Sequence, residues 1–457
     1  MRIVFVQMPP IEYAWRGEVS LAYQVLGDGP IDLIYLQGYL SNVEINWENP
    51  RLARFLRELG AHTRLIITDR RGLGLSERFT PADTPATEVL MDDVAAVIAA
   101  TGSVRPVIFA TGDCGPVAMH FAASHPEQIS ALILHGSHAT VRKTEDTPWG
   151  QTDSEVIQQA EWVRDRFTTG EWMANANPSI ISHPGDTEWA ARYERLSLTP
   201  GAVYTESLRF SETDVRSVLP AIQTPTLVLH RTGDPEDEIE GGRFLASQIG
   251  TAKFVELAGS DHFPWLGDQD SVLREVSRFV QGVQAEEADF DRVLATVLFT
   301  DIVDSTRMVS EMGDGEWSSL LRRHYLVMRS VLSRFRGNEV NTTGDGILAT
   351  FDGPGRAVRC ALAAIEASHQ IGVEIRAGGH TGEIQQLPGD VGGIAVHVAA
   401  RIAALANPGE VLVSRTVKEL ASGSGLEFAS RGNFELKGVP GDWPLFQVVQ
   451  PEAAVSR

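Results

Sequence analysis

The sequence predicts a two-domain protein of the α/β class, on three observations. The chain of 457 residues is longer than one hydrophobic core ordinarily serves. From residue 18 to about 283, strand-like apolar runs alternate with segments of helical periodicity, which is the pattern of a parallel sheet wound with helices. After an acidic segment at 280–292, the apolar run at 294–303 opens a second alternating region.

Six apolar runs define the strands expected in the first domain. In chain order they are IDLIYLQG, TRLIITDRRG, RPVIFATGD, ISALILHG, TPTLVLHRTGD and AKFVELAGSDH. We expect this domain at 1–283, a linker at 284–293 and the second domain at 294–457.

The stretch from about 141 to 215 interrupts the alternation. Its sequence is polar and helical in pattern, and it contains Trp149, Trp162, Trp172 and Trp189. We interpret it as a lid inserted over the sheet, and the alternative is an ordinary helical excursion.

Composition and charge exclude several classes of protein. The chain is 43% hydrophobic and 22% charged, as in a globular protein, and no apolar run reaches the roughly 18 residues that span a bilayer. Its beginning lacks a basic flank and a cleavage signal, so we expect a cytoplasmic protein without a membrane segment. Cys114 and Cys360 lie far apart without metal-type spacing, which argues against a disulfide and a structural zinc.

The negative charge is shared unevenly between the two domains. The net charge is −21, of which residues 1–293 carry −18 and residues 294–457 carry −3. This balance argues against general nucleic-acid binding, and it makes the second domain the less repulsive host for a polyphosphate.

Four segments of the first domain resemble the α/β-hydrolase superfamily: DRRGLGLSE, FAASHPEQISALILHG, HRTGD and GSDHFPW. The resemblance covers nearly all of residues 18–283 and implies a doubly wound sheet with a helical lid. Enzymes of this fold place a serine or cysteine on a strand-to-helix elbow, backed by an acid and a histidine. The resemblance assigns the acid to Asp234 and the base to His262.

The elbow itself lacks a nucleophile. Counting from VIFAT and from Phe121 places Gly112 where the hydroxyl belongs. Cys114 is two residues later, and a free cysteine at such a place is usually buried and inert. We therefore interpret this site as vestigial, and the domain as a ligand-binding or scaffold unit.

In the second domain, VLFTDIVDST and NTTGDGILATF together resemble the class III nucleotidyl cyclases, and the resemblance covers residues 294–449. It includes IRAGGHTGE, DVGGIAVHVAARIAAL, GEVLVSRTVKEL and FELKGVPG. It implies an α+β, ferredoxin-like domain that joins a second copy head to tail. Each site then takes metal ligands from one protomer and base-reading and transition-state groups from the other.

The resemblance assigns a role to each matching residue. Two Mg²⁺ or Mn²⁺ ions would be held by Asp301 and Asp345, assisted by the Ile302 carbonyl. Arg376 and Lys437 would contact the β- and γ-phosphates of ATP. The other protomer would supply Asp390 for the purine, and His397 and Arg401 for the ribose and α-phosphate. His397 stands where the mammalian-type pattern has asparagine.

Asn341 is the other departure from the family pattern, because adenylate cyclases of this class carry lysine there. An asparagine amide can donate to adenine N1 or accept from guanine N1, so Asn341 alone does not choose the base. Asp390 only accepts, and facing guanine O6 it would be left unpaired, at a cost of about 1–3 kcal/mol. We expect adenine to be preferred by a narrower margin than a Lys/Asp pair gives.

Three functions remain open on the sequence. The leading hypothesis is a homodimeric adenylate cyclase that converts ATP to 3′,5′-cyclic AMP and pyrophosphate, with the hydrolase-like domain in a regulatory role. The alternatives are an ester hydrolase that uses Cys114 and a catalytically weak nucleotide sensor. We also expect a small apolar or acyl-type ligand beneath the lid.

Overall fold

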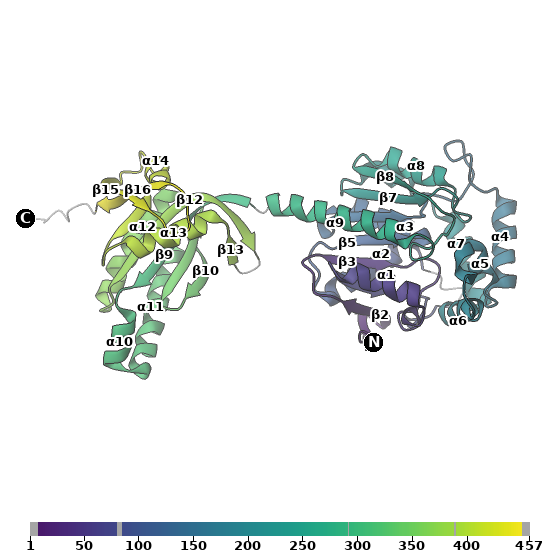
Figure 1. Cartoon of the computed structure of the whole chain (residues 1–457), viewed down its shortest axis with the longest axis horizontal. Helices are drawn as coiled ribbons and strands as arrows, with labels where there is room; N and C mark the ends of the chain where they lie inside the picture. Colours follow the sequence, from purple (N-terminus) through teal and green to yellow (C-terminus); the bar gives the residue numbers. More distant parts are fainter. Residues whose placement is uncertain (1–7, 80–84, 291, 388–389, 450–457) are drawn as a thin grey trace, which may run out of the picture. The chain divides into compact units, whose positions relative to one another are not determined.

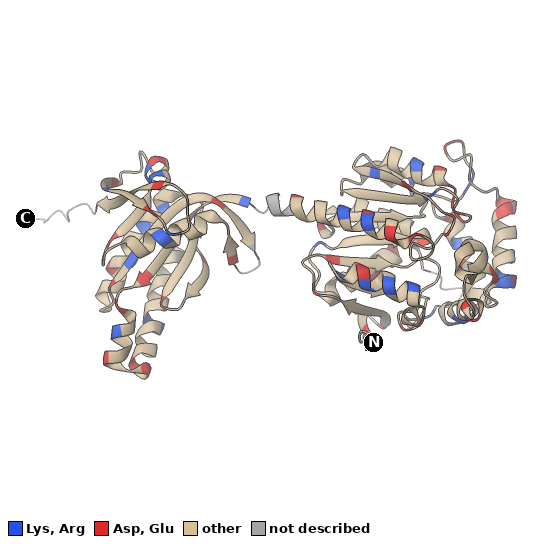
Figure 2. Cartoon of the chain, in the orientation of Figure 1, with Lys and Arg blue, Asp and Glu red and all other residues tan. Residues whose placement is uncertain are grey.

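The structure, a computed structural model, divides into two compact units: unit 1, Met1–Gln284, and unit 2, Ala285–Arg457. It describes residues 8–79, 85–290, 292–387 and 390–449. The division falls within α9 (Gln269–Phe290), so most of the segment predicted as a linker is helical. In the described ranges, no helix has the length and apolar content that a membrane crossing requires. Acidic and basic segments are interspersed on each unit in the view of Figure 2.

Unit 1 is built on an eight-stranded sheet of order β1-β2-β4-β3-β5-β6-β7-β8. The six predicted runs form the parallel part of the sheet, while the β1–β2 hairpin pairs antiparallel with itself and with β4. The strands are β1 (Glu12–Arg16), β2 (Val19–Leu26), β3 (Asp32–Leu36), β4 (Arg64–Thr68), β5 (Val107–Thr111), β6 (Ala131–His135), β7 (Thr226–Arg231) and β8 (Ala252–Leu257).

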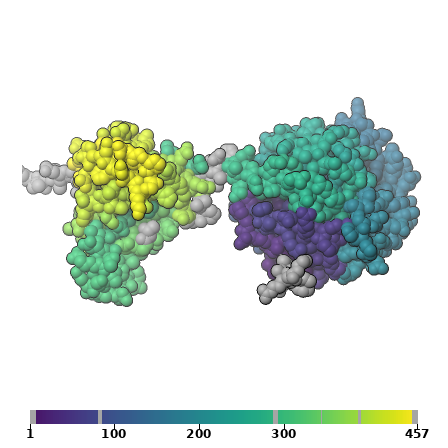
Figure 3. Space-filling view, viewed as in Figure 1, coloured from purple at the N-terminus to yellow at the C-terminus, as the bar shows by residue number. Residues whose placement is uncertain are grey.

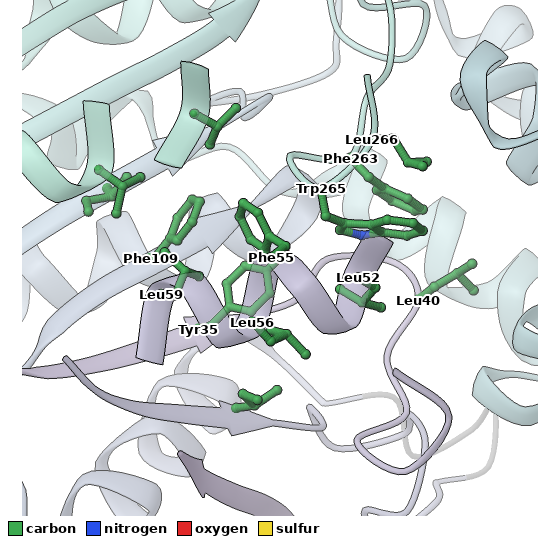
Figure 4. Close-up of a cluster of buried hydrophobic side chains, with 14 of the residues drawn as sticks. Tyr35, Leu40, Leu52, Phe55, Leu56, Leu59, Phe109, Phe263, Trp265 and Leu266 are labelled. Atoms are coloured by element: carbon green, nitrogen blue, oxygen red, sulfur yellow. The ribbon is translucent and has the colours of Figure 1, made fainter. Parts of the chain in front are cut away.

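Helices cover both faces of this sheet, because its central strands are apolar on both sides. On one face, Leu52, Phe55 and Leu56 of α1 pack on Tyr35 and Phe109 of the strands (Figure 4). Helix α9 lies on the same face, and α2, α3 and α8 lie on the other. The helices are α1 (Pro50–Gly60), α2 (Thr87–Thr101), α3 (Gly115–Ser124) and α8 (Ile239–Gln248); short 3₁₀ turns are η1 (Ile45–Trp47), η3 (Gly112–Cys114), η4 (Pro126–Gln128), η5 (Pro178–Ile181) and η6 (Arg216–Ala221).

Four helices fill the segment predicted as a lid, between β6 and β7, and they lie together along one edge of unit 1 (Figures 1 and 3). Thr152 opens the first of them with a reciprocal capping box to Glu155, which satisfies two backbone donors. Trp172 of the second helix is buried in the core, and Trp189 of the third stacks on Tyr193. The four are α4 (Asp153–Arg166), α5 (Glu171–Ala176), α6 (Asp186–Ser197) and α7 (Pro200–Glu212).

Unit 2 contains a second eight-stranded sheet, with the path β10-β11-β9-β12-β14-β16-β15 and β13 paired to β12. Its centre is the long antiparallel pairing of β9 with β12, which places Asp301 opposite Arg376. The strands are β9 (Arg292–Ile302), β10 (Asn338–Thr343), β11 (Gly346–Phe351), β12 (Ile375–Leu387), β13 (Asp390–Gly392), β14 (Val411–Ser414), β15 (Glu427–Glu435) and β16 (Asp442–Val449).

The two faces of this sheet carry different helices. Helices α11 and α12 pack on the face that contains Ile302 and Ile347, and α13 packs on the opposite face over Val297. Helix α10 and the start of α11 project from the sheet (Figure 1). The helices are α10 (Ser305–Met312), α11 (Asp314–Arg334), α12 (Pro354–Gln370), α13 (Ile394–Leu405) and α14 (Arg415–Leu420).

Candidate functional site

A carboxylate and an arginine form an ion pair at the end of β9. Arg376 donates from Nε and Nη2 to Asp301 Oδ2, at 3.0 and 2.6 Å, and from Nη1 to the Ala404 carbonyl of α13 at 3.2 Å. Both side chains of the pair keep about a third of their surface exposed, 32% for Arg376 and 35% for Asp301. The pair is therefore open to solvent and to exchange of partners.

A second carboxylate, Asp345, lies at the tip of the β10–β11 hairpin. Ile347 of β11 pairs with Thr300 of β9, so the chain brings Asp345 level with Ile302, next to Asp301 along β9. The Tyr325 hydroxyl of α11 donates to the Gly344 carbonyl and anchors this tip. Two carboxylates thus come from the ends of neighbouring strands.

The donors at these strand ends are all oxygens, which suit Mg²⁺ or Mn²⁺. They are the carboxylates of Asp301 and Asp345 and the carbonyl of Ile302, so the residues present fit such ions. Among the described residues, no group of three or more His, Cys, Asp and Glu side chains could hold a metal by itself. Mg²⁺ commonly binds one or two carboxylates and takes further ligands from substrate phosphates.

Asn341 lies on the α13 face of the sheet, opposite Leu348 of β11. An irregularity in the pairing between Glu339 and Asn341 inserts one extra residue, Val340, and sets this register. The side chain is exposed, and its Oδ1 accepts from the Thr342 backbone N–H at 2.8 Å. The amide NH₂ is then the group of Asn341 that can donate to a ligand.

Asp390 lies at the start of β13, close to Asn341. Val340 and Val391 belong to one hydrophobic cluster, and β10 contacts β13. The two residues predicted to read the base therefore come from adjacent segments of a single chain. Asp390 is exposed, and its Oδ1 accepts from the Val391 N–H at 2.8 Å.

His397 and Arg401 are exposed on α13, as their spacing predicts, while Val398 and Ile402 are buried beneath them. The helix lies close on β12, because a Cβ at Gly378 would come within 2.1 Å of the Ala403 nitrogen. Only glycine permits this approach of helix and strand.

The structure does not join all the predicted groups within one chain. Lys437 is exposed in the turn between β15 and β16. In the part of the chain that the structure describes, no hydrogen bond or ion pair connects Asp390, His397, Arg401 or Lys437 with Asp301 or Asp345.

In unit 1, Gly112 occupies the turn between β5 and α3. Its φ of +52° is in the left-handed region, which a strand-to-helix elbow requires and glycine adopts without strain. A Cβ built on Gly112 would lie 3.0 Å from His262 Nε2. Gly112 thus stands where a side chain would face the histidine.

His262 and Asp234 form a buried ion pair. His262 Nδ1 lies 3.1 and 3.0 Å from the two Asp234 oxygens, and backbone N–H groups of Glu236 and Asp237 also approach Asp234 Oδ1 at 3.0 and 3.4 Å. Burial alone would lower the pKa of His262, but the charge and hydrogen bond of Asp234 outweigh it and raise this pKa to about 10. The shift favours the protonated imidazolium, which must first lose its proton before it can act as a base.

Cys114 faces away from this pair. Its side chain is buried in the cluster with Ile108 and Val117, on the face of the sheet opposite α1, and its Sγ donates to the Gln37 carbonyl at 3.0 Å. Burial raises the pKa of the thiol to about 12. These contacts leave no thiolate at the elbow.

A cavity of about 190 Å³ lies beside the elbow, beneath the lid. Its lining includes Trp172 and Phe210, but also three carboxylates, Asp113, Glu236 and Asp237. This composition departs from the apolar site predicted from the sequence. The signal that the sequence offered was the acidic residue after each strand, in TGDCG and TGDPED, but only the fold turns these residues into one cavity.

Comparisons with known proteins identify both units. Residues 33–268 match the family described as alpha/beta hydrolase fold, and residues 286–450 match the adenylate and guanylate cyclase catalytic domain. These matches confirm the two families and the fold class predicted from the sequence.

Three relatives illustrate the two halves. A pimeloyl-(acyl-carrier protein) methyl ester esterase of Nitrosospira multiformis is 26% identical over 271 residues, which are 58% of this chain and 100% of the esterase. Putative adenylate cyclase 3 of Rhizobium meliloti is 31% identical over 157 residues, 32% of this chain and 27% of that protein. An adenylate cyclase of Streptomyces coelicolor is 32% identical over 144 residues, 31% of this chain and 37% of that protein. The chain thus spans well under half the length of either cyclase relative.

Proposed function

Because the chain belongs to the α/β hydrolase fold family and carries an adenylate and guanylate cyclase catalytic domain, we propose that it converts ATP to 3′,5′-cyclic AMP and pyrophosphate. The observation that carries this proposal is the convergence of Asp301, Asp345 and Arg376 at the ends of three neighbouring strands. Carboxylates beside an exchangeable cation are the groups that a metal–triphosphate complex needs.

Asp301, Asp345 and the Ile302 carbonyl would hold the divalent ions. When bound, two such ions neutralise phosphate charge and favour attack of the ribose 3′-oxygen on the α-phosphorus. Arg376 would leave Asp301 to bind the β- and γ-phosphates together with Lys437, which carries a compact charge on a flexible stem.

The base preference would rest on Asn341 and Asp390. Because the Asn341 oxygen accepts from the Thr342 N–H, its NH₂ is free to donate to the acceptor N1 of adenine. Asp390 would accept from the N6 amine. Guanine reverses both demands, with a donor at N1 and an acceptor at position 6, so ATP is the preferred substrate.

The complete site would need two copies of the chain. His397 and Arg401 are exposed on α13 and make no contact with Asp301 or Asp345 in the described single chain, so a second protomer would bring them to the α-phosphate. Arg401 would there stabilise the developing negative charge, and His397 would orient the ribose.

The activity is tested by incubating the purified full chain with Mn²⁺ and either ATP or GTP, and by measuring the cyclic product. We expect cyclic AMP, with less cyclic GMP. Nucleotide binding without any cyclic product would instead favour the sensor hypothesis.

The shared site is tested by mixing two inactive chains, Asp301→Asn and Arg401→Ala. Random exchange makes half of the dimers mixed, and each mixed dimer has one intact site of two. Recovery of about a quarter of the wild-type rate is expected. No recovery after verified exchange would contradict a site built across protomers.

We also propose that residues 1–283 regulate the cyclase domain at 294–457 rather than hydrolyse esters. Gly112 provides no hydroxyl, Cys114 is buried away from His262, and His262 is held as a cation. The elbow and the cavity nevertheless persist, which suits a unit that binds a ligand without converting it.

A further inference from the structure

Most of the charges around the cavity beneath the lid neutralise each other in pairs. His262 pairs with Asp234, and His138 Nδ1 lies 2.7 Å from Asp237 Oδ1. Glu206 takes Arg70 at 2.9 Å and Arg209 at 3.0 Å. The two arginines that pair with Glu206 leave one positive charge over. Part of this charge compensates the carboxylate of Asp113 at the elbow, because Arg70 lies 3.8 Å from it.

Asp113 is the first carboxylate left without a hydrogen bond. Its side chain is 8% exposed, and neither oxygen has a hydrogen-bond partner in the described part of the chain. The nearest cation, Arg70, approaches Oδ2 only to 3.8 Å and lies closer to Glu206, at 2.9 Å, and its nitrogens also lack a hydrogen-bond partner in the described part of the chain. Burial raises the pKa of Asp113 to about 6. A carboxylate buried without partners is unfavourable, so this acceptor is suited to a donor that is not part of the protein.

Glu236 is a second carboxylate with an oxygen that lacks a hydrogen bond within the described residues. It follows β7 in the same loop as Asp234, lines the cavity, and its buried Oε1 has no hydrogen-bond partner among the described residues. Burial raises the pKa of Glu236 to about 7. The two acceptors therefore face one cavity, and a cation bound between them would restore both to their ordinary ionisation.

We propose that this cavity binds a small molecule with a protonated amine, which donates to Asp113 and Glu236 while its carbon skeleton packs on Trp172 and Phe210. The rings of Trp172 and Phe210 line the same cavity and suit a flat apolar group beside a cation. The cavity volume of about 190 Å³ leaves room for a small molecule of this kind.

Benzylamine, benzyl alcohol and benzoate form a matched set of probes for this proposal. They share a ring and differ in the charge and hydrogen-bonding capacity of one group. Titration calorimetry on the full chain should show binding of benzylamine, at least about tenfold weaker binding of the alcohol, and no binding of benzoate. Benzoate tests the opposite charge. His262 Nε2 faces the elbow, so benzoate would bind best if His262, rather than the two carboxylates, selected the ligand.

Two variants place the amine within the cavity. Asp113→Asn and Glu236→Gln keep the shape of each side chain and should each weaken benzylamine binding at least about tenfold. Glu240→Gln is the matched control, since Glu240 is a partly exposed carboxylate on α8 that pairs with Arg243. Thermal unfolding establishes that each variant is folded. If one cavity variant does not fold, the other still tests the proposal.

The proposal is overturned if benzylamine does not bind at millimolar concentration, if benzoate binds more tightly than benzylamine, or if both cavity variants bind benzylamine as the wild type does. Binding is measured without nucleotide, so the result does not depend on the proposed cyclase activity. Cyclase rates with and without benzylamine then test the proposed regulation separately.

Discussion

Each unit presents an acid and a cation paired at the ends of its strands, and the two pairs differ in burial. Asp234 and His262 of unit 1 are 0% and 11% exposed, whereas Asp301 and Arg376 of unit 2 each keep about a third of their surface in solvent. Burial makes the first pair permanent, because separating it would leave a charge in the interior. Exposure lets the second pair exchange partners with ions and phosphates. The contrast fits the proposal that unit 1 binds a ligand without converting it and that unit 2 is the catalytic domain.

The largest effect is expected where the exchangeable pair is broken. Asp301→Asn and Asp345→Asn should each lower the rate of cyclic AMP formation by about 10³-fold, because each removes a negative ligand for the metals. The rate is measured with saturating Mn²⁺ and ATP. Asp352→Asn is the control, since Asp352 is an exposed carboxylate paired with Arg356. If Asp301→Asn and Asp345→Asn kept a metal-dependent activity close to that of Asp352→Asn, neither carboxylate would be a metal ligand.

The inactive frame of unit 1 can be tested by returning its missing side chain. Gly112→Ser places a hydroxyl against His262 Nε2 and should raise hydrolysis of p-nitrophenyl acetate by about 100-fold over the wild type, the lower end of general acid–base catalysis. The gain stays modest because His262 begins as a cation. Residue 112 keeps a positive φ, which costs a non-glycine residue about 1–2 kcal/mol of stability.

Adding His262→Ala to Gly112→Ser should abolish the new esterase activity. The opposite pattern, in which the wild type hydrolyses the ester and Cys114→Ala does not, would show that the elbow has another register.

A smaller effect is expected at the base. Asn341→Lys should raise the ratio of ATP to GTP turnover by about tenfold, because an ammonium donates to adenine N1 and cannot accept from guanine N1. The ratio of kcat/KM for the two nucleotides is the measurement. Asn338→Lys adds the same charge to an exposed position at the other end of β10. An equal shift in both variants would mean that position 341 does not contact the base.

The smallest effect concerns stability and pH. The pKa of His262 is raised to about 10 in the folded state, above its ordinary value of about 6.5, so folding favours the protonated form. The resulting stability is complete below about pH 6.5 and is lost as pH rises toward 10. The melting temperature of unit 1 should therefore fall by about 5–10 °C more between pH 7 and 9.5 in the wild type than in the Asp234→Asn/His262→Gln double variant. Parallel curves for the two proteins would contradict a protonated His262.

Sequence patterns predicted the parts of the fold that depend on local periodicity. The six apolar runs became β3 to β8, and the spacing of His397 and Arg401 placed both on the exposed side of α13. The β1–β2 hairpin was missed: β1 has five residues and is mostly exposed, so its place in the sheet depends on pairing with β2. Sequence periodicity predicts an element well when its buried residues recur at regular spacing. It predicts poorly when the element is buried only by pairing with a strand distant in sequence.

The missed parts of the sites depend on contacts between distant residues. Arg376 lies 75 residues from Asp301, and only the register of β9 and β12 brings the two together. Asp113 and Glu236 are 123 positions apart in the chain, and only the fold brings both to one cavity and buries the oxygens that lack a partner among the described residues. No local spacing encodes such a deficit of hydrogen bonds.

The ion pair between Arg376 and Asp301 has a consequence for how the two components of a metal–nucleotide complex assemble. Arg376 donates to Asp301 from Nε and Nη2, so a phosphate that captures these two donors also frees the carboxylate for a cation. By reciprocity, a cation that captures the carboxylate frees the arginine for the phosphate by the same factor. Nucleotide and metal would then bind with positive cooperativity that originates in the protein itself, and each alone would meet competition from the resting pair.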